Sequence, residues 1–169
     1  MREIVRRSFR LTGPLVVLLL AAGAATAACT DPAGDGVNWR RCYMDGRDLK
    51  QVSLNGAMLR ETTFQRSDLT GATLADADAY RAKFLSARLD RARLDGARLI
   101  EADLTRADLS GASLKGADLR NAKLVGATMM GADLTGARLE GADLRNANLS
   151  GARWTDGRAC GEGSMGQCH

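Results

Sequence analysis

A large apolar residue recurs at every fifth position from Leu49 to Trp154, and the register never shifts. Among these 22 positions only Ala79 is small, and most of the others are leucine. The residue two positions earlier is alanine in every unit from 72 to 152. A period of five is neither the 3.6 of an α-helix nor the 2.0 of an ordinary β-strand. The pattern therefore predicts a repeat architecture built from five-residue units.

Individual units carry a family resemblance. The segments A-D-L-R-N (117–121), A-D-L-T-G (132–136) and A-N-L-S-G (147–151) resemble the A-(D/N)-L-x-x unit of pentapeptide-repeat proteins. The resemblance implies an all-β fold, a right-handed, four-sided parallel β-solenoid with one unit on each side and four units in each coil. Residues 47–156 would then form about five and a half coils.

The chemistry of each unit agrees with such a solenoid. If the central leucine and the preceding alanine point inward, the three polar residues of a unit face water, as Asp103, Thr105 and Arg106 do around Leu104. Glycine recurs at the last outward position, which suits turns with unusual backbone angles. At a coil spacing of about 4.8 Å, the rod would be roughly 26 Å long.

Charged residues test the coil length. Residues twenty positions apart would lie above one another in a four-sided coil. Two such columns alternate in sign: Asp78, Arg98, Asp118, Arg138, and Lys83, Asp103, Lys123, Asp143. Opposite charges on adjacent strands attract and like charges repel, so the order favours coils of twenty residues.

The first 28 residues have the organisation of a secretory signal. Arginines at positions 2, 6, 7 and 10 precede an apolar run, 15–28, that ends in small residues. This run is shorter than the roughly 20 residues that a membrane-spanning helix needs, so we expect a signal peptide. The segment 6–9 (R-R-S-F) resembles a twin-arginine signal, and the general secretory route stays open because Val5 replaces the usual Ser or Thr. The abundance of Ala, Gly, Arg and Asp indicates a bacterial source.

Two processing routes fit the end of this segment. The small residues 25–28 suit cleavage by signal peptidase, which would release a secreted protein. Alternatively, Ala27-Ala28-Cys29 resembles the end of a lipoprotein signal, although Thr26 stands where leucine is usual. We therefore expect an extracytoplasmic protein, either secreted or, in the alternative, lipid-anchored through Cys29 to the outer face of the cell membrane.

All four cysteines lie outside the predicted repeats: Cys29 and Cys42 before them, Cys160 and Cys168 after them. Bridged Cα atoms lie within about 7 Å of each other, whereas the two flanks would lie at opposite ends of the rod. We therefore predict the disulfides Cys29–Cys42 and Cys160–Cys168, unless a tail folds back along the rod. An oxidising compartment favours such bonds, and lipidation of Cys29 would leave Cys42 unpaired. The spacings match no common zinc pattern.

These features divide the chain into four parts. They are the signal peptide (1–28), an N-terminal linker and cap (29–46), the solenoid (47–156) and a C-terminal tail with a disulfide (157–169). Exposed solenoid ends invite aggregation unless they are covered. We expect Trp39 and Tyr43 to lie over the first coil and Trp154 to close the last one.

The residues also limit the classes of function. The single histidine is His169, and no set of residues matches a known catalytic or phosphate-binding motif, so we expect no enzyme, cofactor or metal. Some cytoplasmic proteins of the resembled family mimic DNA and bind topoisomerases, which requires a strongly negative surface. That alternative is disfavoured here, because the signal peptide indicates export and residues 47–156 hold 17 basic and 15 acidic residues. This balance also predicts no nucleic-acid binding.

We therefore expect a monomeric, exported structural or binding module whose partner is a protein or cell-envelope component. A few outward positions are apolar, and they suggest where that partner binds. Tyr80 and Ile100 would stack on one side, and Leu85 and Val125 on the next. Together they predict an apolar strip near a shared corner, rimmed by Arg60, Arg81 and Arg120, which is the composition of a partner site.

Overall fold

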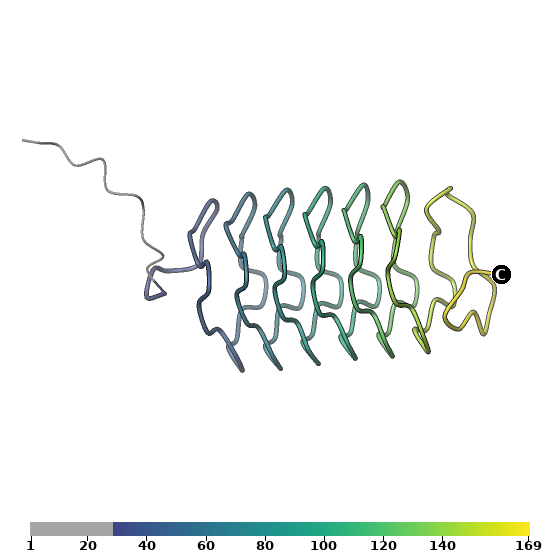
Figure 1. The fold of residues 1–169 in the computed structure, drawn as a ribbon, viewed down its shortest axis with the longest axis horizontal. Helices are drawn as coiled ribbons and strands as arrows, with labels where there is room; N and C mark the ends of the chain where they lie inside the picture. Colours follow the sequence, from purple (N-terminus) through teal and green to yellow (C-terminus); the bar gives the residue numbers. More distant parts are fainter. Residues whose placement is uncertain (1–28) are drawn as a thin grey trace, which may run out of the picture.

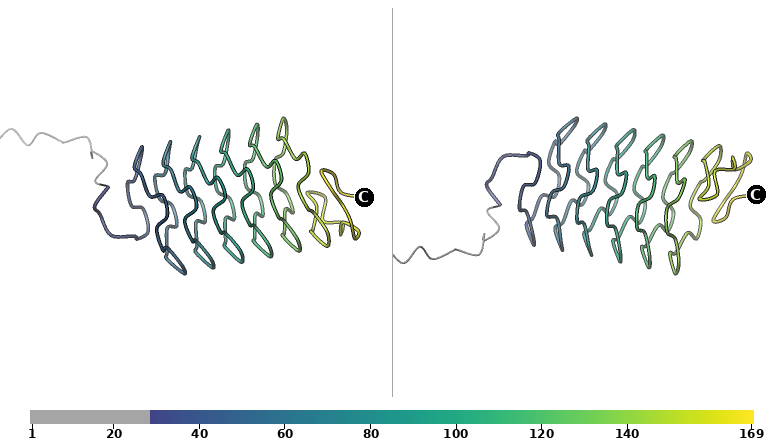
Figure 2. Two further views of the ribbon diagram at one scale, coloured as in Figure 1. Left: turned by 90° about the horizontal axis from the view of Figure 1, so that it is seen from below. Right: turned by 90° about the horizontal axis from the view of Figure 1, so that it is seen from above.

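The computed structural model describes residues 29–169, which form a rod of stacked coils (Figure 1). Within this range there is no helix, and each side of a coil pairs with its neighbours through a single bridging residue. Twenty parallel bridges join each such residue to the one twenty positions later, from Asn38↔Met58 to Asp133↔Arg153. Since each unit has five residues, twenty residues make a four-sided coil. The two further views in Figure 2 show the coils stacked along one axis.

The backbone hydrogen bonds follow one pattern that repeats along the inner coils. Asp103 donates its N–H to the carbonyl of Ala82 in the preceding coil at 2.9 Å, and Leu104 donates to Lys123 in the following coil at 2.7 Å. The N–H of Ala107 returns to the carbonyl of Leu104 at 3.0 Å and closes the turn between two sides. Most of the stabilising backbone bonds therefore run between coils, as expected for a repeat protein that is stable only when its units stack.

Every turn between sides has the same unusual backbone conformation. The second turn residue has a positive φ at all positions from 36 to 151 in steps of five. Twelve of these residues are glycine, and twelve carry a side chain, with φ between 55° and 58°. The sequence prediction that the recurrent glycines occupy unusual angles is correct, and the same angles extend to arginine, glutamate and serine.

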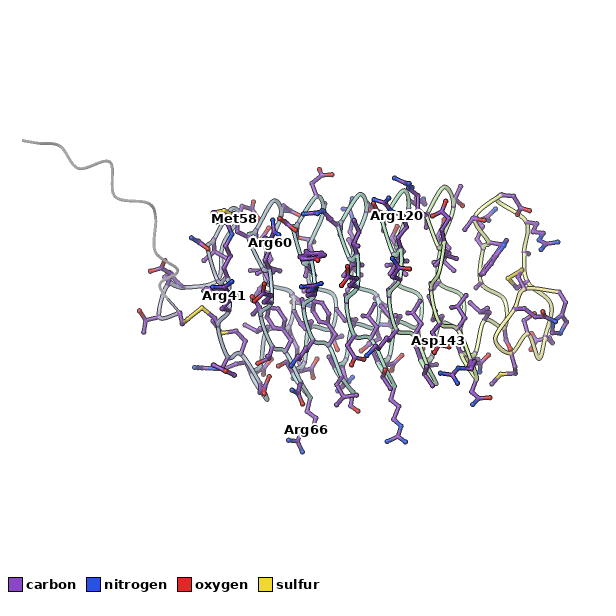
Figure 3. All side chains as sticks on the ribbon, viewed as in Figure 1. Arg41, Met58, Arg60, Arg66, Arg120 and Asp143 are labelled. Carbon is purple, nitrogen blue, oxygen red and sulfur yellow. A yellow bond between two sulfur atoms is a disulfide. The ribbon has the colours of Figure 1, made fainter. Side chains whose placement is uncertain are left out.

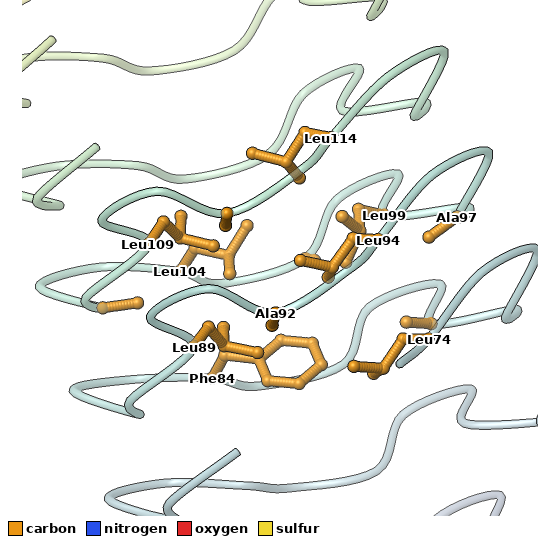
Figure 4. Packing of buried hydrophobic residues seen from close by; sticks show 14 of the residues in the cluster. Leu74, Phe84, Leu89, Ala92, Leu94, Ala97, Leu99, Leu104, Leu109 and Leu114 are labelled. Carbon is orange, nitrogen blue, oxygen red and sulfur yellow. The ribbon is translucent and has the colours of Figure 1, made fainter. Parts of the chain in front are cut away.

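The interior is filled as the sequence predicts, by the central residue and the small residue of each unit. Leu99, Leu104 and Leu109, the central residues of three successive units, are fully buried, and Figure 4 shows their side chains filling the space between the sides. The rings of Phe64 and Phe84 stack with centroids 5.1 Å apart and planes 6° apart. Trp39, the central residue of the adjoining side of the first coil, packs against this stack, with its ring centroid 6.4 Å from that of Phe64.

The repeat begins earlier than the sequence analysis predicted. Asn38 already pairs with Met58, and Trp39 and Met44 are buried as central residues of the first coil. The predicted boundary at residue 47 is therefore wrong, and the extra units lengthen the solenoid beyond the expected five and a half coils. The prediction for Tyr43 is also wrong, because its side chain points outward and is 80% exposed.

The two flanks each carry one disulfide. Cys29 Sγ lies 2.01 Å from Cys42 Sγ, and Cys160 Sγ lies 2.07 Å from Cys168 Sγ, which are the two predicted pairs. The C-terminal tail crosses the last coil, and its antiparallel bridges are Asn148↔Met165 and Arg153↔Ala159. It covers two of the four sides of that coil, and Trp154 packs against the core beneath it.

The predicted signal peptide, 1–28, lies outside the described residues. Among residues 29–169, no helix is long and apolar enough to cross a membrane.

Candidate partner-binding surface

The four sides of the rod differ in what they present to solvent. We call them sides A to D; in one coil they hold residues 78–80 (A), 83–85 (B), 88–90 (C) and 93–95 (D), and the residues twenty positions before and after belong to the same sides. Figure 3 shows the side chains of the rod as sticks.

On side A, the predicted charge column forms ion pairs between coils. Arg98 Nη1 lies 3.2 Å from Asp78 Oδ1, and Arg138 Nη1 lies 3.7 Å from Asp118 Oδ2. Arg120 also binds Asp118: its Nε and Nη2 donate to the two carboxylate oxygens at 2.8 and 2.7 Å. This contact lowers the pKa of Asp118 and raises that of Arg120. The opposite charges of this column therefore form ion pairs within the protein.

Tyr80 does not present a free aromatic ring. The guanidinium carbons of Arg60, Arg81 and Arg98 lie 5.0, 4.9 and 5.2 Å from its centroid. The hydroxyl of Tyr80 donates to Glu101 Oε1 at 3.3 Å. Because three cations surround the ring, the side chain is partly buried and its apolar area is covered.

The arginine next to Tyr80 is itself fixed. Arg81 Nε donates to Glu101 Oε2 at 2.8 Å, and this hydrogen bond lowers the pKa of Glu101. The predicted arginine rim therefore consists of paired groups: Arg81 with Glu101, Arg120 with Asp118, and Arg60 with Asp78 at 3.7 Å.

The predicted strip is divided in two. Tyr80 and Ile100 lie at the turn between sides A and B, whereas Leu85 and Val125 lie at the following turn, and all four are partly buried. The column of Lys83 and its equivalents runs along side B between these two turns. The structure therefore gives two apolar edges on either side of a charged column.

The charged column of side B differs from that of side A. Parallel backbone bridges join Asp103 to Lys83 in the preceding coil and to Lys123 in the following coil. Within residues 29–169, however, neither lysine has an ion pair at 4 Å or less. A hollow of about 470 Å³ opens here, lined by Arg81, Lys83, Glu101, Asp103, Asn121 and Lys123. Side B therefore combines two unpaired cations, a hollow and apolar edges.

Two further features were missed in the sequence. A second hollow, of about 530 Å³, is lined by Arg40, Arg41, Arg60 and Glu61. Its first two arginines lie in the segment taken for a cap, and the five-residue spacing of Trp39, Met44 and Leu49 would have placed them in the repeat. Met130 is also an exposed apolar residue on side C, at 48%.

The described residues offer no evident metal site: no group of three or more His, Cys, Asp or Glu in 29–169 could hold an ion. The carboxylates with shifted pKa values, among them Asp68, Asp118 and Asp143, all shift downward because of hydrogen bonds to neighbouring hydroxyl, guanidinium and N–H groups. Such ionised, hydrogen-bonded carboxylates suit a structural surface.

Comparison with known proteins agrees with this geometry. The family model for pentapeptide repeats matches the chain in eight copies, over residues 40–76, 48–85, 87–124 and 112–151. No curated protein matches.

Among solved structures, HetL, a pentapeptide repeat protein involved in heterocyst differentiation regulation from the cyanobacterium Nostoc sp. strain PCC 7120, is 32% identical, with 76% of this chain and 67% of that chain covered and a TM-score of 0.57. Rfr23 from the cyanobacterium Cyanothece 51142 is 26% identical, with coverages of 69% and 90% and a TM-score of 0.44. QnrB1, a plasmid-mediated fluoroquinolone resistance protein, is 22% identical, with coverages of 75% and 72% and a TM-score of 0.39. The chain therefore belongs to the pentapeptide repeat family.

Proposed function

We propose that this chain is an exported, non-catalytic binding module whose partner surface is side B with the apolar edge formed by Leu85 and Val125. The observation that carries the proposal is the pair of lysines, Lys83 and Lys123, which stand without an ion pair within the described part of the chain. On side A the alternating column of Asp78, Arg98, Asp118 and Arg138 is paired between coils, so a structural account of that column is complete. On side B it is incomplete.

The chemistry of side B indicates what the partner presents. Unpaired ammonium groups beside the apolar side chains of Leu85 and Val125 suit a protein segment that carries carboxylates next to apolar residues. Apolar area with a charged rim is typical of protein–protein contacts. The rigid spacing of the coils fixes these groups in advance, which reduces the entropy lost on binding.

A photo-crosslinking experiment tests the surface. A photoreactive residue replaces Leu85 in one variant and Met130, the exposed apolar residue of side C, in the control. We expect a cell-envelope protein to be captured from position 85 and not from position 130. Equal capture from both positions would contradict a partner surface on side B.

The captured partner then permits a quantitative test. Lys83→Ala combined with Lys123→Ala should weaken its binding at least tenfold. Lys115→Ala is the matched control, because Lys115 already binds Asp133 at 3.4 Å on side D. If the control weakens binding as much as the double variant, the effect is a general one of net charge.

Export is tested by the mass and N-terminus of the mature protein from native culture. Removal of residues up to 27 or 28 is expected. A Cys29 engaged with Cys42 has no thiol left to carry a lipid, so a diacylglycerol on Cys29 would establish the lipoprotein alternative instead. Retention of the whole segment would contradict export.

A further inference from the structure

A basic hollow lies at the turn between sides A and B in the first two coils. Its volume is about 530 Å³, and it is lined by Arg40, Arg41, Arg60 and Glu61. Arg40 and Arg60 occupy the same position in successive coils, because Asn38 pairs with Met58. Two like charges are therefore stacked here, whereas Asp78 and Arg98 on the same side alternate. Figure 3 labels Arg41 and Arg60 at this end of the rod.

The neighbouring carboxylates do not compensate both charges. Glu61 Oε2 accepts a hydrogen bond from Arg41 Nε at 3.0 Å. Asp78 Oδ2 lies 3.7 Å from Arg60 Nη1, but Asp78 is also bound by Arg98 at 3.2 Å. Arg40 has no ion pair to any residue between 29 and 169. Three arginines and one glutamate leave the hollow with about two uncompensated positive charges.

Two of the three arginines are oriented by neighbouring side chains. The guanidinium of Arg60 lies 5.0 Å from the centroid of the Tyr80 ring, and its side chain is 41% exposed. Arg41 is oriented by its bond to Glu61. An anion that enters the hollow therefore meets two guanidinium groups that already have an orienting contact, which reduces the entropy lost on binding.

We propose that this hollow binds a phosphate monoester group. Such a group carries about −1.5 to −2 charge near pH 7, which matches the uncompensated charge. Its tetrahedral oxygens can accept guanidinium donors from two coils and from the turn at once, whereas a carboxylate presents two oxygens in one plane. The site lies in the first two coils, whereas Lys83 and Lys123 of the partner surface proposed above lie in later coils, so the two proposals are tested by different variants.

The test follows the Arg Nε–Hε resonances of the purified protein by NMR during titration with inorganic phosphate at constant ionic strength. We expect saturable shifts at Arg40 and Arg60, and an affinity for phosphate at least tenfold higher than for acetate. Glucose 6-phosphate and a phosphoserine peptide, titrated in parallel, distinguish the source of the group, since the tighter ligand identifies a phosphorylated sugar or a phosphorylated protein.

Two matched variants separate the site from general charge attraction. Arg40→Gln with Arg60→Gln should abolish the saturable shifts. Arg66→Gln with Arg106→Gln removes the same charge from exposed turn positions, of which Arg66 points away from the rod in Figure 3, and should leave phosphate binding unchanged. Equal affinity for phosphate and acetate, or equal loss in both variants, would overturn the proposal.

Discussion

The left-handed backbone conformation of the turns predicts opposite changes in the free energy of unfolding for substitutions at Gly131 and Ser86. Gly131 has φ +65°, and a Cβ added there would meet nothing within 4 Å, so Gly131→Ala changes only the backbone energy. Ser86 has φ 55° at an equivalent turn. Gly131→Ala therefore introduces backbone strain at its turn, whereas Ser86→Gly removes the same kind of strain at another turn.

The magnitude follows from two opposing effects. A non-glycine residue in the left-handed region costs about 1–2 kcal/mol. Alanine also restricts the unfolded chain, which returns about 0.4–1 kcal/mol. We expect Gly131→Ala to lower the free energy of unfolding by about 0.5–1 kcal/mol, and Ser86→Gly to raise it by a similar amount.

Urea denaturation followed by circular dichroism measures both changes, with an unchanged m-value as evidence that the denatured state is the same. The sign of Ser86→Gly decides the question. At an ordinary backbone position, glycine destabilises by about 0.5–1 kcal/mol relative to alanine. A destabilised Ser86→Gly variant together with an unaffected Gly131→Ala variant would refute left-handed turns.

Three further outcomes are expected. Leu104→Asp should abolish cooperative unfolding, because Leu104 is fully buried and the charge finds no partner, whereas Thr105→Asp should change the melting temperature little; equal effects in a thermal melt would show that the inward assignment is wrong. The double variant Cys160→Ser/Cys168→Ser removes a disulfide that closes a loop of sequence separation 8, and it should lower the free energy of unfolding by about 2.5 kcal/mol. Hydrogen exchange should show lost protection in the last coil, and a uniform loss along the rod would contradict a local cap. The hydrogen bond from Arg120 lowers the pKa of Asp118 below its ordinary 3.8 in the folded protein. The stability that this carboxylate contributes is therefore complete above the pKa of the unfolded state and is lost as the pH falls through the folded-state pKa. The difference in free energy of unfolding between wild type and Asp118→Asn should shrink from about pH 6 to about pH 2, and a constant difference would contradict the ionic contact.

The core of this fold could be predicted from the sequence because its signal is periodic. Leu104 and its equivalents are buried wherever the five-residue register continues. The start of the solenoid was predicted wrongly because the first units show only part of the five-residue pattern. Trp39 and Met44 continue the central series, but Arg47 occupies a position that is alanine in most units, and this interruption hid the first coil.

For the surface, the sequence predicted which residues stack above one another in successive coils, but not which neighbours their side chains contact. The column that joins Asp78 to Arg98 was visible in the sequence, and their ion pair is present. The direction of a long side chain was not visible, because it depends on neighbours from three coils. Tyr80 is the example: the sequence placed it correctly in its column, but the arginines that cover its ring made it unavailable as an apolar contact.

This division explains why the function is harder to infer than the fold. In a solenoid the inward residues fix the architecture, and the outward residues have only one structural duty, which is to avoid repulsion between coils. An outward charge that has a partner in the next coil, such as Arg98, is accounted for by that duty. Arg40, Lys83 and Lys123 form no ion pair in the described chain, so no direct contact with a carboxylate engages their charged groups. They are therefore the residues at which binding should be sought first.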